Sequence, residues 1–179
     1  MIKLVLILIS AYSISSWAAE DSKLIKAVHE GSISEVTALA KNPTELKWKD
    51  SEGFDALFYA VSLNDLEKTQ ALLDSNATTK NLYTAKKESL LFEATRLGSE
   101  PVLSALIKKD PTLLKIKNAD DESPVFEAVR QDQSAMVKLL VKKGLSLKEK
   151  NKAGKTPAQY VDSKNKKMTA LFKELKLAK

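Results

Sequence analysis

Apolar and polar positions along the chain follow a period much longer than a helical turn. A short phrase returns at regular intervals, as SKLIKAVHEG, DALFYAVSLN, SLLFEATRLG, SPVFEAVRQD and, more loosely, TPAQYVDSKN. We align these copies on the residue near the centre of each phrase, which is Ala27, Ala60, Ala94, Ala128 and Val161. Consecutive anchors are then 33 or 34 residues apart. A fixed period of this length is typical of repeat proteins, in which each copy is one structural unit.

A second apolar stripe follows each of the first four copies, with residues at positions i, i+3 and i+4. This spacing predicts one buried face of an α-helix. Connectors rich in Asp, Asn, Ser and Gly separate the copies and predict turns. Each unit is therefore expected to be a helix, a tight turn, a second helix and a polar connector, and the fold class is all-α. The second-helix stripes are Val36, Leu39 and Ala40; Thr69, Leu72 and Leu73; Leu103, Leu106 and Ile107; and Val137, Leu140 and Val141.

The start of each first helix carries a capping residue. Ser123-Pro124 and Thr156-Pro157 place proline in the first helical turn, where its missing N–H costs nothing. Ser22, Asp55 and Ser89 provide the cap alone. With the period, these starts and the endings Asn76-Ala77 and Lys143-Gly144, residues 20 to 175 resemble the ankyrin-repeat family.

The resemblance implies a solenoid of about five helix-turn-helix units in a domain spanning residues 19–179. A degenerate N-terminal cap would cover 22–49, and three central repeats would cover 50–82, 83–116 and 117–149. A basic capping unit at 150–179 would close the array, with Met168, Leu171, Phe172 and Leu175 as its apolar stripe.

Three phenylalanines replace the histidine of the family motif. They are Phe58, Phe92 and Phe126, with Gln159 in the last copy. Histidine hydrogen-bonds between neighbouring ankyrin repeats, whereas phenylalanine only packs. We interpret the three rings as a buried ladder along the seam between units; the alternative is an aromatic ligand box.

The first 18 residues differ from the rest of the chain. Lys3 gives a short positive start, an apolar run spans 4–9, and the small residues Ser16 and Ala18 match a signal-peptidase site. We expect a signal peptide at 1–18, cleaved near Ala18/Ala19. A membrane anchor is the alternative, but the run is too short to cross ~30 Å of hydrocarbon. Export without any cysteine favours a bacterial periplasm, with no transmembrane anchor after cleavage.

Positive charge is concentrated at the C-terminal end, where residues 142–179 hold twelve lysines against three acidic residues. A basic tail is one sign of nucleic-acid binding. However, Arg96 and Arg130 are the only arginines, and arginine is the residue that grips phosphates and reads bases. We therefore expect no nucleic-acid partner and a solvated capping unit. A weak attraction to anionic cell-wall polymer is an alternative.

Little catalytic or metal-binding material is present in the sequence. His29 is the only histidine and there is no cysteine, so His29 has no such residue with which to share a metal. Asp120-Asp121-Glu122 lacks the ligand spacing of a calcium loop. There is also no phosphate-binding loop or nucleophile motif. We expect no enzyme activity and no cofactor.

Binding is the remaining class of function. In ankyrin arrays the turn tips and the exposed positions of the first helices form one concave surface, and the resemblance implies the same surface here. Arg and aromatic side chains dominate protein interfaces, although Phe54 and Trp48 could instead pack against the turns. The predicted partner-binding residues are Ser51, Glu52, Phe54, Ser62, Leu63, Lys86, Glu88, Arg96, Leu97, Asp120, Glu122, Arg130, Gln131 and Lys155.

The resemblance extends to exported ankyrin proteins that protect a bacterium from its own cell-wall hydrolases. It implies a periplasmic protein, monomeric when unbound, that sequesters and inhibits a secreted peptidoglycan hydrolase or endopeptidase as an immunity protein. A non-inhibitory envelope scaffold that supports a periplasmic enzyme is the second hypothesis, and a binder of anionic cell-wall polymer is the third.

Overall fold

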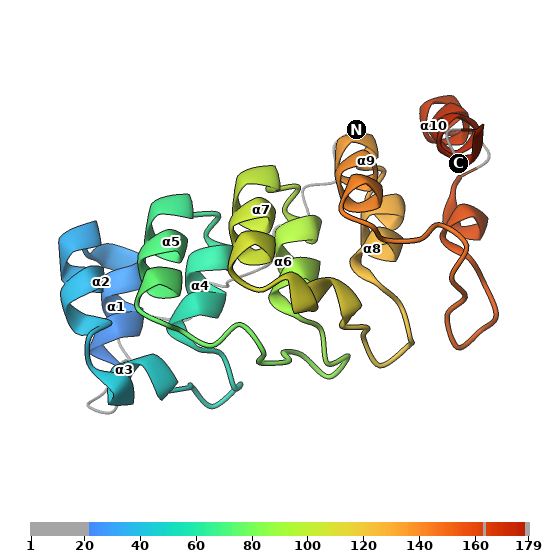
Figure 1. Cartoon of the computed structure of the whole chain (residues 1–179). Helices are drawn as coiled ribbons and strands as arrows, with labels where there is room; N and C mark the ends of the chain where they lie inside the picture. Colours follow the sequence, from blue (N-terminus) through green and yellow to red (C-terminus); the bar gives the residue numbers. More distant parts are fainter. Residues whose placement is uncertain (1–21, 163, 178–179) are drawn as a thin grey trace.

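A computed structural model of the chain is all-helical over the residues it describes, 22–162 and 164–177 (Figure 1). No strand is present in these ranges; one isolated antiparallel bridge joins Tyr83 and Glu88. The predicted signal peptide, 1–18, lies outside the described residues. The helices are α1 (Lys23–Glu30), α2 (Ile33–Leu39), α3 (Pro43–Lys47), α4 (Ala56–Ser62), α5 (Leu66–Asp74), α6 (Leu90–Arg96), α7 (Glu100–Lys109), η1 (Pro111–Lys115), α8 (Pro124–Arg130), α9 (Ser134–Lys142), η2 (Pro157–Tyr160) and α10 (Lys166–Leu177).

Neighbouring helices pack as antiparallel pairs, and the pairs stand side by side in one row (Figure 1). We call α1, α4, α6, α8 and η2 the inner helices, because each packs against the next in the series. We call α2, α5, α7, α9 and α10 the outer helices. The tips are the turns 50–54, 83–88, 118–122 and 151–155, which precede the inner helices. The first four predicted units each contain one such pair, whereas in the fifth α10 packs against α9 of the unit before it.

The predicted capping residues directly precede the inner helices, but Ser89 and Ser123 make no side-chain capping hydrogen bond, whereas Ser22 and Asp55 do. The Ser22 hydroxyl accepts a hydrogen bond from the Ile25 N–H at 3.2 Å, and the Asp55 carboxylate accepts one from the Phe58 N–H at 2.9 Å. The polar or glycine residue four positions after the anchor also has a structural reason. Asn64, Gly98 and Asp132 have φ values of 56°, 68° and 56°, a left-handed conformation that Gly and Asn/Asp adopt at least cost.

The apolar stripes of the second helices form the core between the two layers. Of the twelve predicted positions, all are buried except Leu39 and Val141, which are partly buried. The phenylalanine ladder is confirmed for Phe92 and Phe126, both fully buried. The prediction is wrong for Phe58, which is only partly buried because it stacks on Phe54 rather than entering the core.

Two kinds of connector alternate along the row. Units 1 and 3 end in a short proline-initiated helix, α3 or η1, capped by the side chain of Asn42 or Asp110. These sequences, NPTELK and DPTLLK, lie two units apart. In units 2 and 4 the outer helix ends instead at a residue of positive φ, Asn76 or Gly144. The array therefore has a double-unit period on top of the single one.

The fifth unit departs from the other four. Its inner helix is only the 3-10 turn η2, because the sequence after Tyr160 has turn-forming residues and the Asp162 carboxylate accepts from the Lys164 N–H. Its outer helix α10 buries Met168, Leu171 and Phe172 as predicted. In the described part of the chain, no helix combines the length and apolar character needed to cross a membrane.

Candidate protein-binding face

Three register positions meet on the inner-helix side of each unit. They lie six residues before the anchor, one before it and two after it. In unit 2 they are aromatic or small, in units 3 and 4 they are ionic, and in unit 5 the two described positions are Lys and Tyr. The sets are Phe54, Tyr59 and Ser62; Glu88, Glu93 and Arg96; Glu122, Glu127 and Arg130; and Lys155 and Tyr160.

Arg96 joins three carboxylates from two units. Its guanidinium contacts Glu88 at 2.8 Å (Nη2 to Oε2) and Glu93 of the same unit. Its Nε lies 3.4 Å from Oε1 of Glu127 in the next unit. The three glutamate side chains are less than 10% exposed, whereas Arg96 is 27% exposed. Arg96 thus compensates buried negative charge and links units 3 and 4.

Arg130 repeats this arrangement one unit further on. Its Nη1 lies 2.9 Å from Glu122 and its Nη2 lies 3.1 Å from Glu127. The guanidinium carbon is 5.6 Å from the ring centre of Tyr160 in unit 5, a cation–π distance. We call Glu88, Glu93, Arg96, Glu122, Glu127 and Arg130 the ionic cluster. It contains four carboxylates and two guanidinium groups, so it carries excess negative charge when all are ionised.

The carboxyl groups of this cluster differ in how well they are compensated. Burial raises the pKa of Glu93 above its usual value, against the attraction of Arg96, and the charges of Glu88 and Glu127 add to the rise. Burial also acts to raise the pKa of Glu127. There, however, a hydrogen bond from Gln131 and the charges of both arginines hold the pKa below its usual value. Of these two carboxyl groups, Glu93 is therefore the less well compensated.

Aromatic rings occupy the same face in units 1 and 2 and at Tyr83, the first residue of the unit 3 tip. Phe54 stacks on Phe58 with ring centres 4.0 Å apart and an interplanar angle of 8°. Phe58 lies 4.8 Å from Tyr83, and His29 lies 4.8 Å from Tyr59. The rings are anchored by carboxylates: the Tyr59 hydroxyl donates to Asp50, and the Tyr83 hydroxyl donates to Asp55 at 2.9 Å. We call His29, Phe54, Phe58, Tyr59 and Tyr83 the aromatic cluster.

Backbone hydrogen bonds join the tips of units 3, 4 and 5 into one edge beside the ionic cluster. The Lys86 carbonyl accepts from the Ala119 N–H at 2.6 Å, and the Asp120 carbonyl accepts from the Lys152 N–H at 2.9 Å. These bonds join the tips of units 3, 4 and 5. No backbone hydrogen bond joins the described residues of tip 50–54 to those of tip 83–88. Units 2 and 3 are joined here by side chains instead, since the Tyr83 hydroxyl donates to Asp55 and the Tyr83 ring lies 4.8 Å from that of Phe58.

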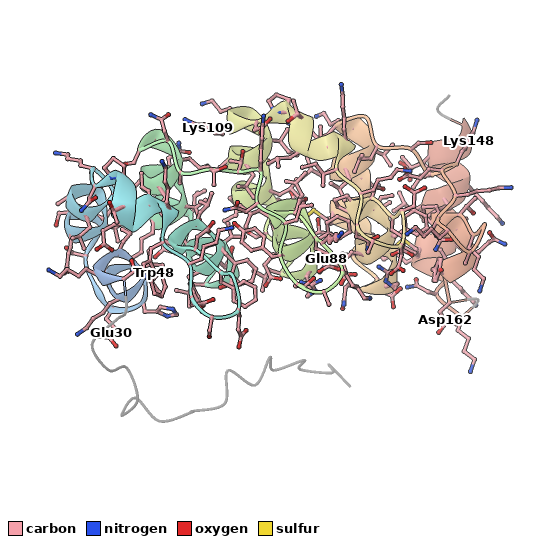
Figure 2. The ribbon with its side chains drawn as sticks, turned by 90° about the horizontal axis from the view of Figure 1, so that it is seen from below. Glu30, Trp48, Glu88, Lys109, Lys148 and Asp162 are labelled. Atoms are coloured by element: carbon pink, nitrogen blue, oxygen red, sulfur yellow. The ribbon has the colours of Figure 1, made fainter. Side chains whose placement is uncertain are left out.

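The predicted partner-binding residues fall into three groups in the structure. Phe54, Ser62 and Arg96 are partly buried, and Glu88 and Glu122 are buried, at 6% and 4% exposed. Figure 2 shows Glu88 near the middle of the row on the inner-helix side, with Lys109 at the opposite edge. Glu88 and Glu122 pair with Arg96 and Arg130 and so position the two guanidinium groups on this face. The exposed members are Ser51, Glu52, Leu63, Lys86, Leu97, Asp120, Arg130, Gln131 and Lys155.

Glu93 and Glu127 belong to this face but were not predicted from the sequence. The signal for the two glutamates was present, because ESLLFEATR at 88–96 and ESPVFEAVR at 122–130 share the pattern E-S-x-x-F-E-A-x-R. The pattern places two acids and one arginine at fixed spacing in both units. The sequence analysis predicted Arg96 and Arg130 as contacts for a partner, not as the ion-pair partners of these glutamates.

Large apolar side chains are exposed on both sides of the row. Leu63 and Leu97 are 42% and 38% exposed at equivalent ends of α4 and α6. Ile33 and Leu66 are 40% and 41% exposed at equivalent starts of α2 and α5, where they line a shallow groove with Thr37. Leu63 and Leu97 each stand one residue after a register position of the inner-helix side, Ser62 or Arg96. Ile33 and Leu66 instead begin outer helices.

No group of three or more metal-ligating side chains is present within residues 22–162 and 164–177. No known family model matches the sequence, and a search of characterised proteins finds no relative. The inner-helix face, with its exposed leucines, arginines and aromatic rings, is therefore the candidate functional site.

Proposed function

We propose that the chain is an ankyrin-type protein-binding module that acts through its inner-helix face. The observation that carries the proposal is the register itself. Positions that share one place in the fold hold Phe-Tyr-Ser in unit 2 and Glu-Glu-Arg in units 3 and 4. A purely structural repeat has no need for this change. A surface that must complement one particular partner does need it, because specificity is set residue by residue.

The exposed leucines support a protein partner over a small ligand. Leu63 and Leu97 lie one unit apart on the side where Arg130 and the aromatic rings are partly exposed. Arg and Tyr are enriched in interface hot spots, and apolar side chains around them exclude water from the contact. A small-molecule site is a concave pocket lined mostly by apolar groups. Two open grooves found among the described residues lie instead on units 1 and 2, largely along α1, α2 and α5.

We further propose that the partner is a secreted peptidoglycan endopeptidase and that binding inhibits it in the periplasm. This step rests on the export-type leader and on the resemblance to exported ankyrin immunity proteins. In such a complex the inner-helix face would cover the entrance of the partner's active site. The chain would then protect its own cell from the enzyme.

Turnover in a purified system tests this proposal. Endopeptidases encoded by the same organism are assayed on isolated peptidoglycan with rising amounts of the mature chain. An inhibitor lowers turnover of one enzyme to near zero at a one-to-one ratio. A scaffold forms the complex but leaves turnover unchanged or raises it. If no endopeptidase is inhibited or bound, the immunity function is wrong.

A further inference from the structure

Side chains connect neighbouring units by one rule along the inner-helix face. The residue two positions after an anchor reaches the residue one position before the next anchor. His29 of unit 1 reaches Tyr59 of unit 2, with ring centres 4.8 Å apart. Arg96 of unit 3 reaches Glu127 of unit 4, and Arg130 of unit 4 reaches the ring of Tyr160 in unit 5.

The rule fails at one step, between units 2 and 3. The bridging position is Ser62, whose hydroxyl donates to the carbonyl of Tyr59 in its own helix at 2.9 Å. No ion pair or hydrogen bond joins Ser62 to the described residues of unit 3. Glu93, the residue that a longer side chain would reach, is only 6% exposed and receives only Arg96 of its own unit. Among the described residues this step also has no backbone bond between the tips; Tyr83 of unit 3 joins it to unit 2 through Asp55 and Phe58.

We propose that an arginine side chain of the partner protein occupies this step and completes the row. It would take the place that Arg96 and Arg130 hold in the next two units, with its guanidinium against Glu93. This inference rests on the proposed protein-binding function and names the chemistry of its central contact.

Charge and aromatic character at this step both fit a guanidinium group. The ionic cluster has four carboxylates for two arginines, and Asp50 and Glu52 add negative charge at the neighbouring tip. In unit 2 the positions corresponding to Glu88 and Glu93 are Phe54 and Tyr59, and a planar cation also packs well on such rings. A bidentate contact with a buried carboxylate favours arginine over lysine.

The surroundings favour a protein as the source of the arginine. Leu63 and Leu97 directly follow the bridging positions Ser62 and Arg96 in the chain and are each about two-fifths exposed. Apolar residues on both sides of the inserted arginine would cover them and exclude water. Such a ring of apolar contacts around a charged anchor strengthens the central contact.

A partner-independent titration tests the site. The full chain is labelled with ¹³C, and the pKa of the Glu93 carboxyl is measured with N-acetyl-arginine amide at constant ionic strength. N-acetyl-citrulline amide, of the same shape but uncharged, is the control. We expect the arginine amide to lower the pKa of Glu93 by about 1 and to shift the resonances of Tyr59 and Leu63. Citrulline amide should bind at least about tenfold more weakly.

Two variants supply the missing side chain within the chain itself. Ser62→Arg should lower the pKa of Glu93 without any probe and abolish binding of the arginine amide. Ser62→Met fills similar space without charge and should do neither. The inference is overturned if the arginine amide affects Glu93 no more than citrulline amide does. It is also overturned if Glu93 titrates alike in the two variants.

These outcomes separate the site from the proposed function. The titrations involve no enzyme, so a failed titration beside a clear inhibition of an endopeptidase leaves the proposed function standing and removes the arginine contact. Where inhibition is observed, Ser62→Arg should weaken it at least about tenfold, and Ser62→Met should weaken it less. Equal inhibition by Ser62→Arg and the unmodified chain overturns the inference.

Discussion

The two halves of the inner-helix face occupy the same register but are held together differently. Units 1 and 2, with Tyr83 at the start of unit 3, use rings that stack on one another and are tied to Asp50 and Asp55. Units 3 and 4 use glutamates and arginines that pair within and between units. Aromatic packing is tolerant of position, whereas a buried carboxylate needs a matched cation. The ionic half therefore joins its units through paired charges, whereas units 2 and 3 are joined through Tyr83, which donates to Asp55 and packs on Phe58.

The largest expected difference is between equivalent phenylalanines of the two halves. Phe92→Ala should lower the free energy of unfolding by ~3–5 kcal/mol, because the ring is fully buried. Phe58→Ala should lose about half as much, since Phe58 is partly exposed beside Phe54. Urea unfolding followed by circular dichroism measures both. Leu82→Ala, at 46% exposure, is the control and should change stability by less than about 0.5 kcal/mol. Equal losses of unfolding free energy in Phe58→Ala and Phe92→Ala would contradict the expected difference between the two halves.

Removal of either arginine should show how far the ionic half depends on pairing. Arg96→Ala leaves buried carboxylates without their cation and should lower the free energy of unfolding by about 2–3 kcal/mol, a value reduced for the partial exposure of Arg96. Arg130→Ala should cost less, about 1–2 kcal/mol, because Arg130 contacts two carboxylates rather than three.

The exposed pair Lys138–Glu174 provides the control for the arginine variants. Its nitrogen and oxygen are 3.5 Å apart, and its side chains are 55% and 63% exposed. Lys138→Ala should cost less than about 0.5 kcal/mol. If Arg96→Ala is as mild as Lys138→Ala, the ionic cluster does not stabilise the array.

The aromatic half should respond to pH through its histidine. Burial lowers the pKa of His29, with Glu30 opposing and Lys68 adding to the effect. The unfolded chain then binds a proton that the folded chain resists, so stability should fall as the pH drops below about 6.5. The slope is at most about 1.4 kcal/mol per pH unit. Thermal unfolding between pH 7 and 5 measures it.

His29→Phe keeps a ring against Tyr59 but cannot titrate, so its stability should change less than that of the unmodified chain over this pH range. Parallel curves for the two chains would contradict a role for His29. The carboxylates titrate in both chains, so the difference between the curves isolates the histidine.

The smallest expected effect concerns the tip of unit 3, residues 83–88. Lys87 has φ 55° at the position where units 2 and 5 have Gly53 and Gly154. Lys87→Gly should raise the free energy of unfolding by about 0.5–1 kcal/mol, since glycine adopts this conformation without strain. Gly154→Lys, with no neighbouring atom within 4 Å of the added Cβ, should lower it by a similar amount. No change in either variant would show that the conformation of the tip is not strained.

Much of the fold was predictable because it depends on local sequence. The caps at Ser22 and Asp55, the turn residues after the inner helices and the apolar stripes all recur at one spacing, and each acts within its own unit. The short helices at 43–47 and 111–115 were missed. Their shared Asx-Pro-Thr start recurs at twice the period, which a search at one unit does not reveal.

The site was less predictable because its contacts cross between units. Register alone indicated that Arg96 and Arg130 lie on the inner-helix side, but not that Glu127 of the following unit would lie 3.4 Å from Arg96. That contact depends on the distance between packed helices. For this reason, reversal of both arginines to glutamate, a natural test of partner binding from sequence, would disturb the fold itself. Leu63 and Leu97 are the better positions.

The most direct test of the inner-helix face compares two double variants against the inhibited endopeptidase. Leu63→Arg with Leu97→Arg alters this face, whereas Ile33→Arg with Leu66→Arg adds the same charge to outer helices at nearly the same exposure. We predict that the first pair raises the inhibition constant by about 100-fold and the second by less than about threefold. The account would be contradicted if the outer-helix pair abolished inhibition while the pair on the inner-helix face left inhibition unchanged.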